Sequence, residues 1–226
     1  MKSIAVLISG SGTNLQAIID ACSSGRIPDA EVKFVFSNRK AAYGLTRAQS
    51  ASPPIPTDTL ALQPFLKADA QRTRIDYDLE VARRIITGFP DSKIDLIVLA
   101  GFMHVLSEEF LDVISGVREY ETDKRISTPI PIINLHPALP GAFDGANAIQ
   151  RAFEAYQKGD IKGTGVMVHY VVKEVDRGAP ILVREVEILP EDDIAALEER
   201  MHKTEHALLL DAVKKVLSQE PESISS

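Results

Sequence analysis

Residues 4–18 read IAVLISGSGTNLQAI, and this stretch contains the pattern that decides the fold. The five apolar residues 4–8 predict a buried strand, and residues 14–22 have the three- and four-residue spacing of a helix. In the glycine-rich turn between them, free backbone N–H groups meet the positive end of the helix dipole. A phosphate is the expected ligand of this turn, and a turn that only connects strand to helix is the alternative.

The turn differs from the two common nucleotide-binding motifs. A dinucleotide-binding fingerprint has a third glycine and an acidic residue at the end of the second strand. Here Leu15 follows Asn14, and the second apolar run ends in Phe36, Ser37 and Asn38. A Walker motif needs Gly-Lys-Ser or Gly-Lys-Thr, which the turn lacks. We therefore expect a small-molecule phosphate monoester at this turn.

The rest of the chain continues the alternation of short apolar runs and helical patterns. Further strands are expected at residues 32–36, 94–99 and 130–134, and helices at 74–89, 107–114 and 146–156. Near-continuous apolar strands favour a parallel sheet covered on both faces. Residues 166–175 and 179–189 predict an antiparallel hairpin, and residues 191–217 a long final helix. The predicted fold class is α/β, with a mostly parallel sheet, flanking helices and an antiparallel C-terminal extension.

Length and composition indicate an ordinary globular chain. The 226 residues are 45% hydrophobic and 25% charged, and we expect one domain over residues 1–218 with a flexible tail at 219–226. The net charge of −7 argues against nucleic acid or an anionic membrane as a partner, and no apolar run is long enough to span a bilayer. The single cysteine, Cys22, is expected to be a buried, inert thiol. These features predict a cytoplasmic enzyme or binding protein.

Asn134 and His136 follow an expected parallel strand, at the sheet edge where such folds bind ligands. Residues two apart in an extended chain project to the same side, so the two side chains face one space. An amide that donates to a developing oxyanion and an imidazole that moves protons suit acyl transfer. Asp176, in the hairpin turn, is the candidate carboxylate partner of the imidazole, although spacing alone does not bring the two together. A purely structural Asn-x-His pair is the alternative.

The segment His202-Lys203-Thr204-Glu205-His206 matches the H-x-x-E-H pattern of one class of zinc hydrolases. The sequence offers no further acidic ligand for such a metal, because Asp211 lies too close on the same helix. The apolar stripe of that helix sets His202 and Glu205 along its flank, where we expect them to recognise hydroxyl groups. His169, in an apolar strand, is expected to be a structural histidine with its hydrogen bonds satisfied.

Five motifs together resemble a known family. They are residues 7–18, Phe36-Ser37-Asn38-Arg39, Leu99-Ala100-Gly101-Phe102-Met103, Asn134-Leu135-His136-Pro137 and Asp176-Arg177-Gly178-Ala179-Pro180-Ile181. Their types and order closely resemble the phosphoribosylglycinamide formyltransferases, a branch of the folate-dependent formyltransferase family, in their fungal, monofunctional form. The resemblance covers about residues 4–217 and implies a Rossmann-like formyltransferase fold. It implies transfer of the formyl group of 10-formyltetrahydrofolate to the amine of glycinamide ribonucleotide in purine biosynthesis.

The resemblance also implies roles for individual residues. Asn134, His136 and Asp176 match the catalytic positions of the family. Matches to the ribonucleotide-binding positions are Gly12, Thr13, Asn14, His202 and Glu205. Matches to the folate-binding positions are Arg74, Met103, His104, Val105, Leu106, Asn134, Val172, Lys173, Glu174, Val175 and Asp176. No metal is implied. His104 stands where bacterial members commonly carry arginine, and residues 116–129 look like an inserted, solvated loop.

Three other functions remain as alternatives. A formyltetrahydrofolate hydrolase would use water in place of the amine and would need no phosphate site. A catalytically silent phosphosugar-binding protein would not need Asn134, His136 and Asp176. Methionyl-tRNA formylation is disfavoured because the acidic chain shows no basic RNA-binding appendage. The expected partners are small-molecule substrates, and the expected state is a monomer or a weak homodimer.

Overall fold

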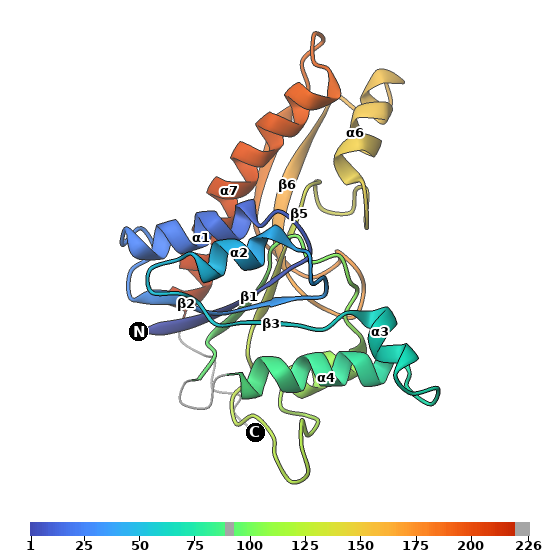
Figure 1. The fold of residues 1–226 in the computed structure, drawn as a ribbon. Helices are drawn as coiled ribbons and strands as arrows, with labels where there is room; N and C mark the ends of the chain where they lie inside the picture. The colour runs from blue at the N-terminus through green and yellow to red at the C-terminus, as the bar shows by residue number, and fades with distance from the viewer. Residues whose placement is uncertain (89–92, 220–226) are drawn as a thin grey trace.

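The computed structural model describes residues 1–88 and 93–219 and places seven strands in one sheet, ordered β3-β2-β1-β4-β5-β6-β7 (Figure 1). The strands are β1 (Lys2–Ile8), β2 (Ala30–Ser37), β3 (Thr57–Thr59), β4 (Leu96–Leu99), β5 (Ile132–His136), β6 (Gly163–Tyr170) and β7 (Pro180–Glu187). β1 to β5 pair in parallel, whereas β5 with β6 and β6 with β7 pair antiparallel. The predicted α/β class and the antiparallel C-terminal extension are confirmed.

Helices cover both faces of this sheet. They are α1 (Thr13–Ser23), α2 (Tyr43–Gln49), α3 (Leu62–Lys67), α4 (Arg74–Thr87), α5 (Glu108–Ile114), α6 (Ala148–Gln157) and α7 (Ile194–Ser218). α1, α2 and α7 pack in one hydrophobic core, and α4 and α5 in a second core on the opposite face (Figure 1). The arrangement explains why the strands between the cores are apolar at nearly every position.

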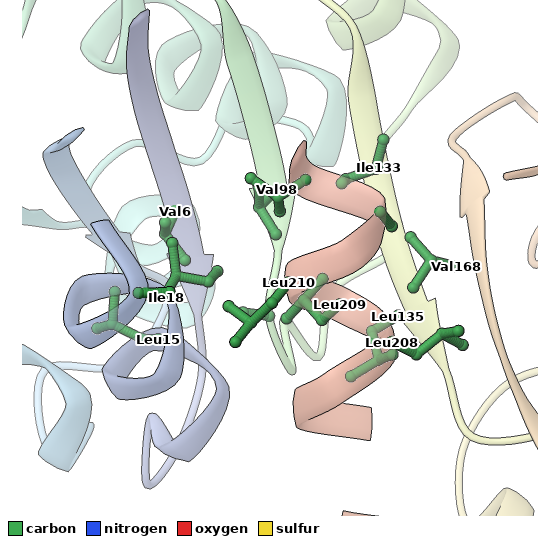
Figure 2. Close-up of a cluster of buried hydrophobic side chains, with 14 of the residues drawn as sticks. Val6, Leu15, Ile18, Val98, Ile133, Leu135, Val168, Leu208, Leu209 and Leu210 are labelled. Carbon is green, nitrogen blue, oxygen red and sulfur yellow. The ribbon is translucent and has the colours of Figure 1, made fainter. Parts of the chain in front are cut away.

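Alternate residues of β1 pack into different hydrophobic cores. Ile4, Val6 and Ile8 belong to the core under α1 and α7, while Ala5 and Leu7 belong to the core under α4 and α5. In Figure 2, side chains of α1 and α7 meet the central strands; the labelled residues are Val6, Leu15, Ile18, Val98, Ile133, Leu135, Val168, Leu208, Leu209 and Leu210. This packing fixes the start of α1, and with it the glycine-rich turn, at the carboxyl end of β1.

The C-terminal hairpin forms as predicted, but its strands are shorter than the apolar pattern suggested. β6 ends at Tyr170 and β7 begins at Pro180, so residues 171–179 form a loop between them. Asp176 has a positive φ of 56°, and a Cβ on Gly178 would lie 1.6 Å from the carbonyl oxygen of Tyr170. A left-handed residue interrupts the extended backbone of a strand, and Gly178 lets the loop backbone pass close to Tyr170. The loop returns to the end of β5, where Asp176 accepts a hydrogen bond from Asn134.

Three short elements were not predicted, namely β3, α2 and α3. β3 has three half-buried residues, two of them threonine, and therefore carries no apolar run. α2 has seven residues and includes Gly44, and α3 has six and includes Pro64. α5 is equally short but was predicted, because Ser107 caps it and two glutamates follow in its first turn. α2 and α3 follow alanines that give no side-chain cap, so nothing in the sequence marks where they begin.

The helices α4 and α7 both end close to residues that the structure does not describe. The expected helix 74–89 is observed as α4, and residue 89 lies outside the described residues. Gln219 caps α7, and Tyr170 donates a hydrogen bond to its side chain at 3.1 Å. Residues 220–226 of the expected tail lie outside the described residues, and the single-domain organisation stays a prediction. In the part of the chain that is described, no helix has the length and apolar character needed to cross a membrane.

Candidate active site

Asn134 and His136 lie at the carboxyl end of β5, beside the antiparallel strand β6. Pairing sets Asn134 opposite His169, and both strands bury their neighbouring residues in the core. Asn134 and His136 both reach Asp176, which confirms that their side chains face the same side. The predicted convergence of an amide, an imidazole and a carboxylate is therefore present in the structure.

Asp176 is the centre of this cluster. Its Oδ1 accepts a hydrogen bond from Asn134 Nδ2 at 3.1 Å, and its Oδ2 accepts one from the backbone N–H of Gly145 at 2.8 Å. His136 Nδ1 lies 3.4 Å from Oδ2, and His169 Nε2 lies 3.5 Å from Oδ1. Burial raises the pKa of Asp176, but the hydrogen bond from the Gly145 N–H and the nearness of the His169 and His136 rings outweigh burial, so the pKa is lowered. Asp176 is thus held as a carboxylate.

His136 is buried between two acceptors. Its side chain is 3% exposed, with Nδ1 facing the Asp176 carboxylate and Nε2 lying 3.2 Å from the carbonyl oxygen of Ala142. The two acceptors fix the orientation of the ring, with Nδ1 toward Asp176 and Nε2 toward the Ala142 carbonyl.

His169 joins the cluster as a residue that the sequence did not single out for function. Its Nδ1 lies 2.8 Å from the Tyr170 carbonyl oxygen, which assigns the proton of the neutral ring to Nδ1. Its Nε2 can then accept a hydrogen bond from Asn134 Nδ2 at 3.2 Å. The expectation of a satisfied histidine holds, but its partners are Asn134 and Asp176. A lone histidine in an apolar strand gives no sign in sequence of what it will face.

Two loops meet at Asp176. Arg177, the next residue, forms an ion pair with Asp144 at 2.6 Å, and Arg151 Nη2 donates to the carbonyl oxygens of Phe143 and Asp144. The loop after β5 is therefore tied to the loop after β6 directly beside the Asp176 carboxylate.

A cavity of about 360 Å³ opens beside the cluster. Most predicted folate-binding residues line it, namely Met103, His104, Val105, Leu106, Asn134, Val172, Lys173, Glu174, Val175 and Asp176. Met103 is 65% exposed and Val105 51% exposed, so the lining presents apolar surface to solvent. Exposed apolar side chains around a cavity are typical of a ligand site.

Arg74 is the one predicted folate residue outside the lining. It is the first residue of α4, and its Nη2 donates to the carbonyl oxygen of Val105 at 2.8 Å, which keeps it next to the cavity wall. Lys173, on the opposite wall, forms an exposed ion pair with Glu108. A cation thus stands beside the cavity, where an anionic part of a ligand could reach it.

His104, in the cavity lining, is held in place by the buried Asp78. Its Nε2 lies 2.5 Å from Asp78 Oδ1, while the backbone N–H of Ser107 donates to Asp78 Oδ2 at 2.9 Å. Asp78 is fully buried, and the rings of Tyr77 and Phe102 pack edge-on against His104. Asp78 was not predicted as a site residue, although an acid on the apolar face of a helix is an available signal for a buried partner.

The glycine-rich turn lies after β1, two strands from Asn134 in the sheet order. Gly12 has a positive φ of 72°, and a Cβ there would lie 2.6 Å from the Cα of Gly44. Thr13 and Asn14 begin α1, with Thr13 exposed and Asn14 half-buried. Ser9 connects the turn to the cavity, because its Oγ accepts a hydrogen bond from the N–H of Met103 at 2.7 Å.

α7 packs against α1 and brings Glu205 to Asn14. Glu205 is buried, and this burial raises the pKa of its carboxyl group; the charge of His202 and a hydrogen bond with Asn14 offset part of the effect. Within residues 1–88 and 93–219, Asn14 Oδ1 is buried without a hydrogen-bond partner. The structure thus joins Asn14 and Glu205, while His202 is exposed on the same helix.

The H-x-x-E-H segment does not gather into a cluster of ligands. His202 is exposed, whereas Glu205 is buried against Asn14. No group of three or more His, Cys, Asp or Glu side chains in the described ranges 1–88 and 93–219 is arranged to hold a metal ion. Elsewhere on that face, burial raises the pKa of the Cys22 thiol to about 11, as expected for an inert cysteine.

The sequence and the fold match one known family. The model of the formyl transferase family matches residues 2–213, so the chain belongs to the formyl transferase family. The phosphoribosylglycinamide formyltransferase of Schizosaccharomyces pombe is 50% identical over 220 residues, or 96% of this chain and 98% of the relative. That of Dictyostelium discoideum is 48% identical over 213 residues, or 94% and 96%. The resemblance inferred from the five motifs is confirmed.

A solved structure supports the same assignment. The crystal structure of phosphoribosylglycinamide formyltransferase from Bacillus halodurans matches with a TM-score of 0.77 at 30% identity, covering 99% of this chain and all 100% of that one. The predicted formyltransferase fold is therefore confirmed over nearly the whole chain.

Proposed function

We propose that this chain transfers the formyl group of 10-formyltetrahydrofolate to the amine of glycinamide ribonucleotide, giving the N-formyl ribonucleotide and tetrahydrofolate in purine biosynthesis. Membership of the formyl transferase family and the two similar relatives support the reaction. The single observation that carries the proposal is the cluster of Asn134, His136 and Asp176 at one end of an apolar cavity.

The cavity suits the folate substrate. Its mixed apolar and polar lining, which includes residues 103–106 and 172–176, suits a flat heterocycle. Arg74, beside the wall, suits the negatively charged glutamate portion of the folate. In this proposal the formyl group is delivered to Asn134 and His136 at the inner end of the cavity.

The turn and α7 suit the ribonucleotide. Backbone N–H groups of Gly12, Thr13 and Asn14 at the start of α1 would receive the phosphate. Glu205 and the unpartnered Asn14 Oδ1 would accept hydrogen bonds from ribose hydroxyls, with His202 at the exposed edge. Ser9 links this half of the site to Met103 in the cavity wall, so the two substrates approach from neighbouring strand ends.

The reaction then proceeds by acyl transfer. The ribonucleotide amine attacks the formyl carbon, and the carbonyl electrons move onto the oxygen, where Asn134 Nδ2 and the His136 imidazolium stabilise the charge. For this, Asn134 replaces its 3.2 Å contact with His169 by one to the oxyanion. The bond from carbon to the folate nitrogen breaks as His136 assists transfer of the amine proton to that nitrogen. Asp176, 3.4 Å from Nδ1, holds the imidazole in its orientation throughout.

The proposal is tested by following the formyl carbon. With 10-formyltetrahydrofolate labelled with ¹³C at the formyl carbon, NMR should show the label in an amide of the ribonucleotide. A hydrolase would release the label as formate whether or not the ribonucleotide is present, and that result would overturn the proposal. Because Asn134 and an imidazolium supply the charge stabilisation, we expect full activity after exhaustive treatment with a chelator.

A further inference from the structure

Arg47, on α2, reaches across to the glycine-rich turn. Its Nε donates a hydrogen bond to the carbonyl oxygen of Ser11 at 2.8 Å, and its Nη1 donates to Gln16 Oε1 at 3.5 Å. Its guanidinium carbon lies 5.1 Å from the centre of the exposed Tyr43 ring. The side chain is thus fixed at three points, two of them on the turn or the first turns of α1.

The guanidinium carries a full positive charge. Within residues 1–88 and 93–219, no carboxylate lies within 4.0 Å of the Arg47 nitrogens, whereas the half-buried Arg84 pairs with two acids. Arg47 is half-buried. A charge that is partly removed from water and unpaired is costly unless an anion completes its environment.

α2 also shapes the turn itself. The N–H of Gly44 donates to the carbonyl oxygen of Gly10 at 3.1 Å. A Cβ on Gly12 would lie 2.6 Å from the Cα of Gly44, and a Cβ on Gly44 would collide with the side chain of Ile8. With Arg47 on Ser11, three consecutive turn residues are held by one short helix. The carbonyl oxygens of Gly10 and Ser11 are engaged by α2, which leaves the N–H groups at the start of α1 for an anion.

We propose that Arg47 belongs to the ribonucleotide phosphate site, as a residue that both positions the turn and supplies the positive charge for the phosphate dianion. The proposal rests on the proposed function for the identity of the substrate. It adds a side chain from α2 to a site otherwise built from backbone groups of α1. It also accounts for how a chain of net charge −7 attracts an anionic substrate to this turn.

The test pairs a variant with a substrate that lacks the phosphate. Arg47→Met removes the charge and keeps a long side chain, and Arg47→Lys keeps the charge without the fork of donors. With glycinamide ribonucleotide, we expect kcat/KM of Arg47→Met to fall about tenfold or more, mainly through KM, and Arg47→Lys to recover part of the loss. With the dephosphorylated glycinamide riboside, we expect less than about a twofold change, because the lost interaction is absent.

Calorimetric titration with ribose 5-phosphate gives a readout that needs no catalysis. We expect the wild type to bind it and Arg47→Met to bind about tenfold or more weakly, with Lys214→Met, an exposed lysine on α7, unchanged as a control. Equal losses on the two glycinamide substrates, or unaltered ribose 5-phosphate binding in Arg47→Met, would overturn the role of Arg47. Normal ribose 5-phosphate binding by the wild type without any formyl transfer would instead overturn the proposed function alone.

Discussion

Asn134 donates to a carboxylate and an imidazole at once, through an amide that the reaction needs for the oxyanion. Replacing it by alanine removes a donor to the transition state, and a lost oxyanion donor typically costs about 3 kcal/mol. We therefore expect Asn134→Ala to lower kcat about a hundredfold or more while the KM for the ribonucleotide changes little. Steady-state kinetics of both substrates measure this, with Gln150→Ala on the exposed side of α6 as an amide control. Wild-type turnover in Asn134→Ala would exclude the assigned role.

Glu205 is a buried carboxyl group that lowers the stability of the fold when it is ionised, and we propose that it binds the ribonucleotide. Burial raises its native pKa, so its stabilising contribution is present at low pH, where it is protonated, and is lost as the pH rises through the native pKa. Glu205→Gln keeps the neutral shape. We expect it to raise the free energy of unfolding by about 1 kcal/mol at pH 7, with the gain shrinking toward pH 4, and to weaken ribonucleotide binding.

Denaturant titrations across this pH range test the expectation for Glu205. Glu199→Gln is the matched control on the same helix, because the hydrogen bond from Lys203 lowers the pKa of the exposed Glu199. That substitution should give no gain in stability at pH 7. A Glu205→Gln protein less stable than the wild type at pH 7, and equally so at low pH, would contradict the pKa argument.

At the residue scale, the sequence predicts the direction of side chains along one strand. It predicts few of the contacts that side chains make between strands. Alternation placed Asn134 and His136 on one side, because that property belongs to a single extended segment. Asp176 could be named as the candidate carboxylate from its place in the hairpin turn, but its distance to His136 could not be predicted, since that depends on a left-handed residue and on a loop that doubles back. His169 and Asp78 gained their partners from strand register and helix packing, which no local pattern encodes.

At the element scale, the start of α4 carries Arg74 beside the cavity. Thr73 and Asp76 form a reciprocal capping box, in which each side chain accepts from the other's backbone N–H. We expect Thr73→Ala to lower the free energy of unfolding by about 1 kcal/mol. Thr87→Ala, at the exposed end of the same helix, should have a smaller effect in the same denaturant titration. Equal effects of the two substitutions would show that the box contributes nothing.

Elements with a clear apolar pattern or a helix cap could be predicted. β1, α1 and α7 carry enough apolar repeats to show their period, and the short α5 begins at a capping serine. α2 has seven residues and no side-chain cap, yet it supplies Gly44 and Arg47 to the turn. The part of the site that sequence reasoning missed most completely therefore lies on a helix that has neither signal.

At the scale of the whole molecule, the strand order places the glycine-rich turn and Asn134, which are far apart in sequence, near each other in space. β4 lies between β1, which carries the turn, and β5, which carries Asn134, while β6 adds His169 and the loop with Asp176. Motifs more than a hundred residues apart thus share one edge of the sheet, as expected for ligand sites in open α/β folds. With a net charge of −7, attraction of anionic substrates depends on local groups such as Arg47 and Arg74.

The central claim is that one site brings both substrates together for formyl transfer. The most direct measurement is a difference absorbance spectrum that follows tetrahydrofolate formation from 10-formyltetrahydrofolate, with and without glycinamide ribonucleotide. We expect tetrahydrofolate formation that depends strictly on the added ribonucleotide and saturates with its concentration. Tetrahydrofolate formation at the same rate without the ribonucleotide, or none with it, would exclude formyl transfer between the two substrates at this site.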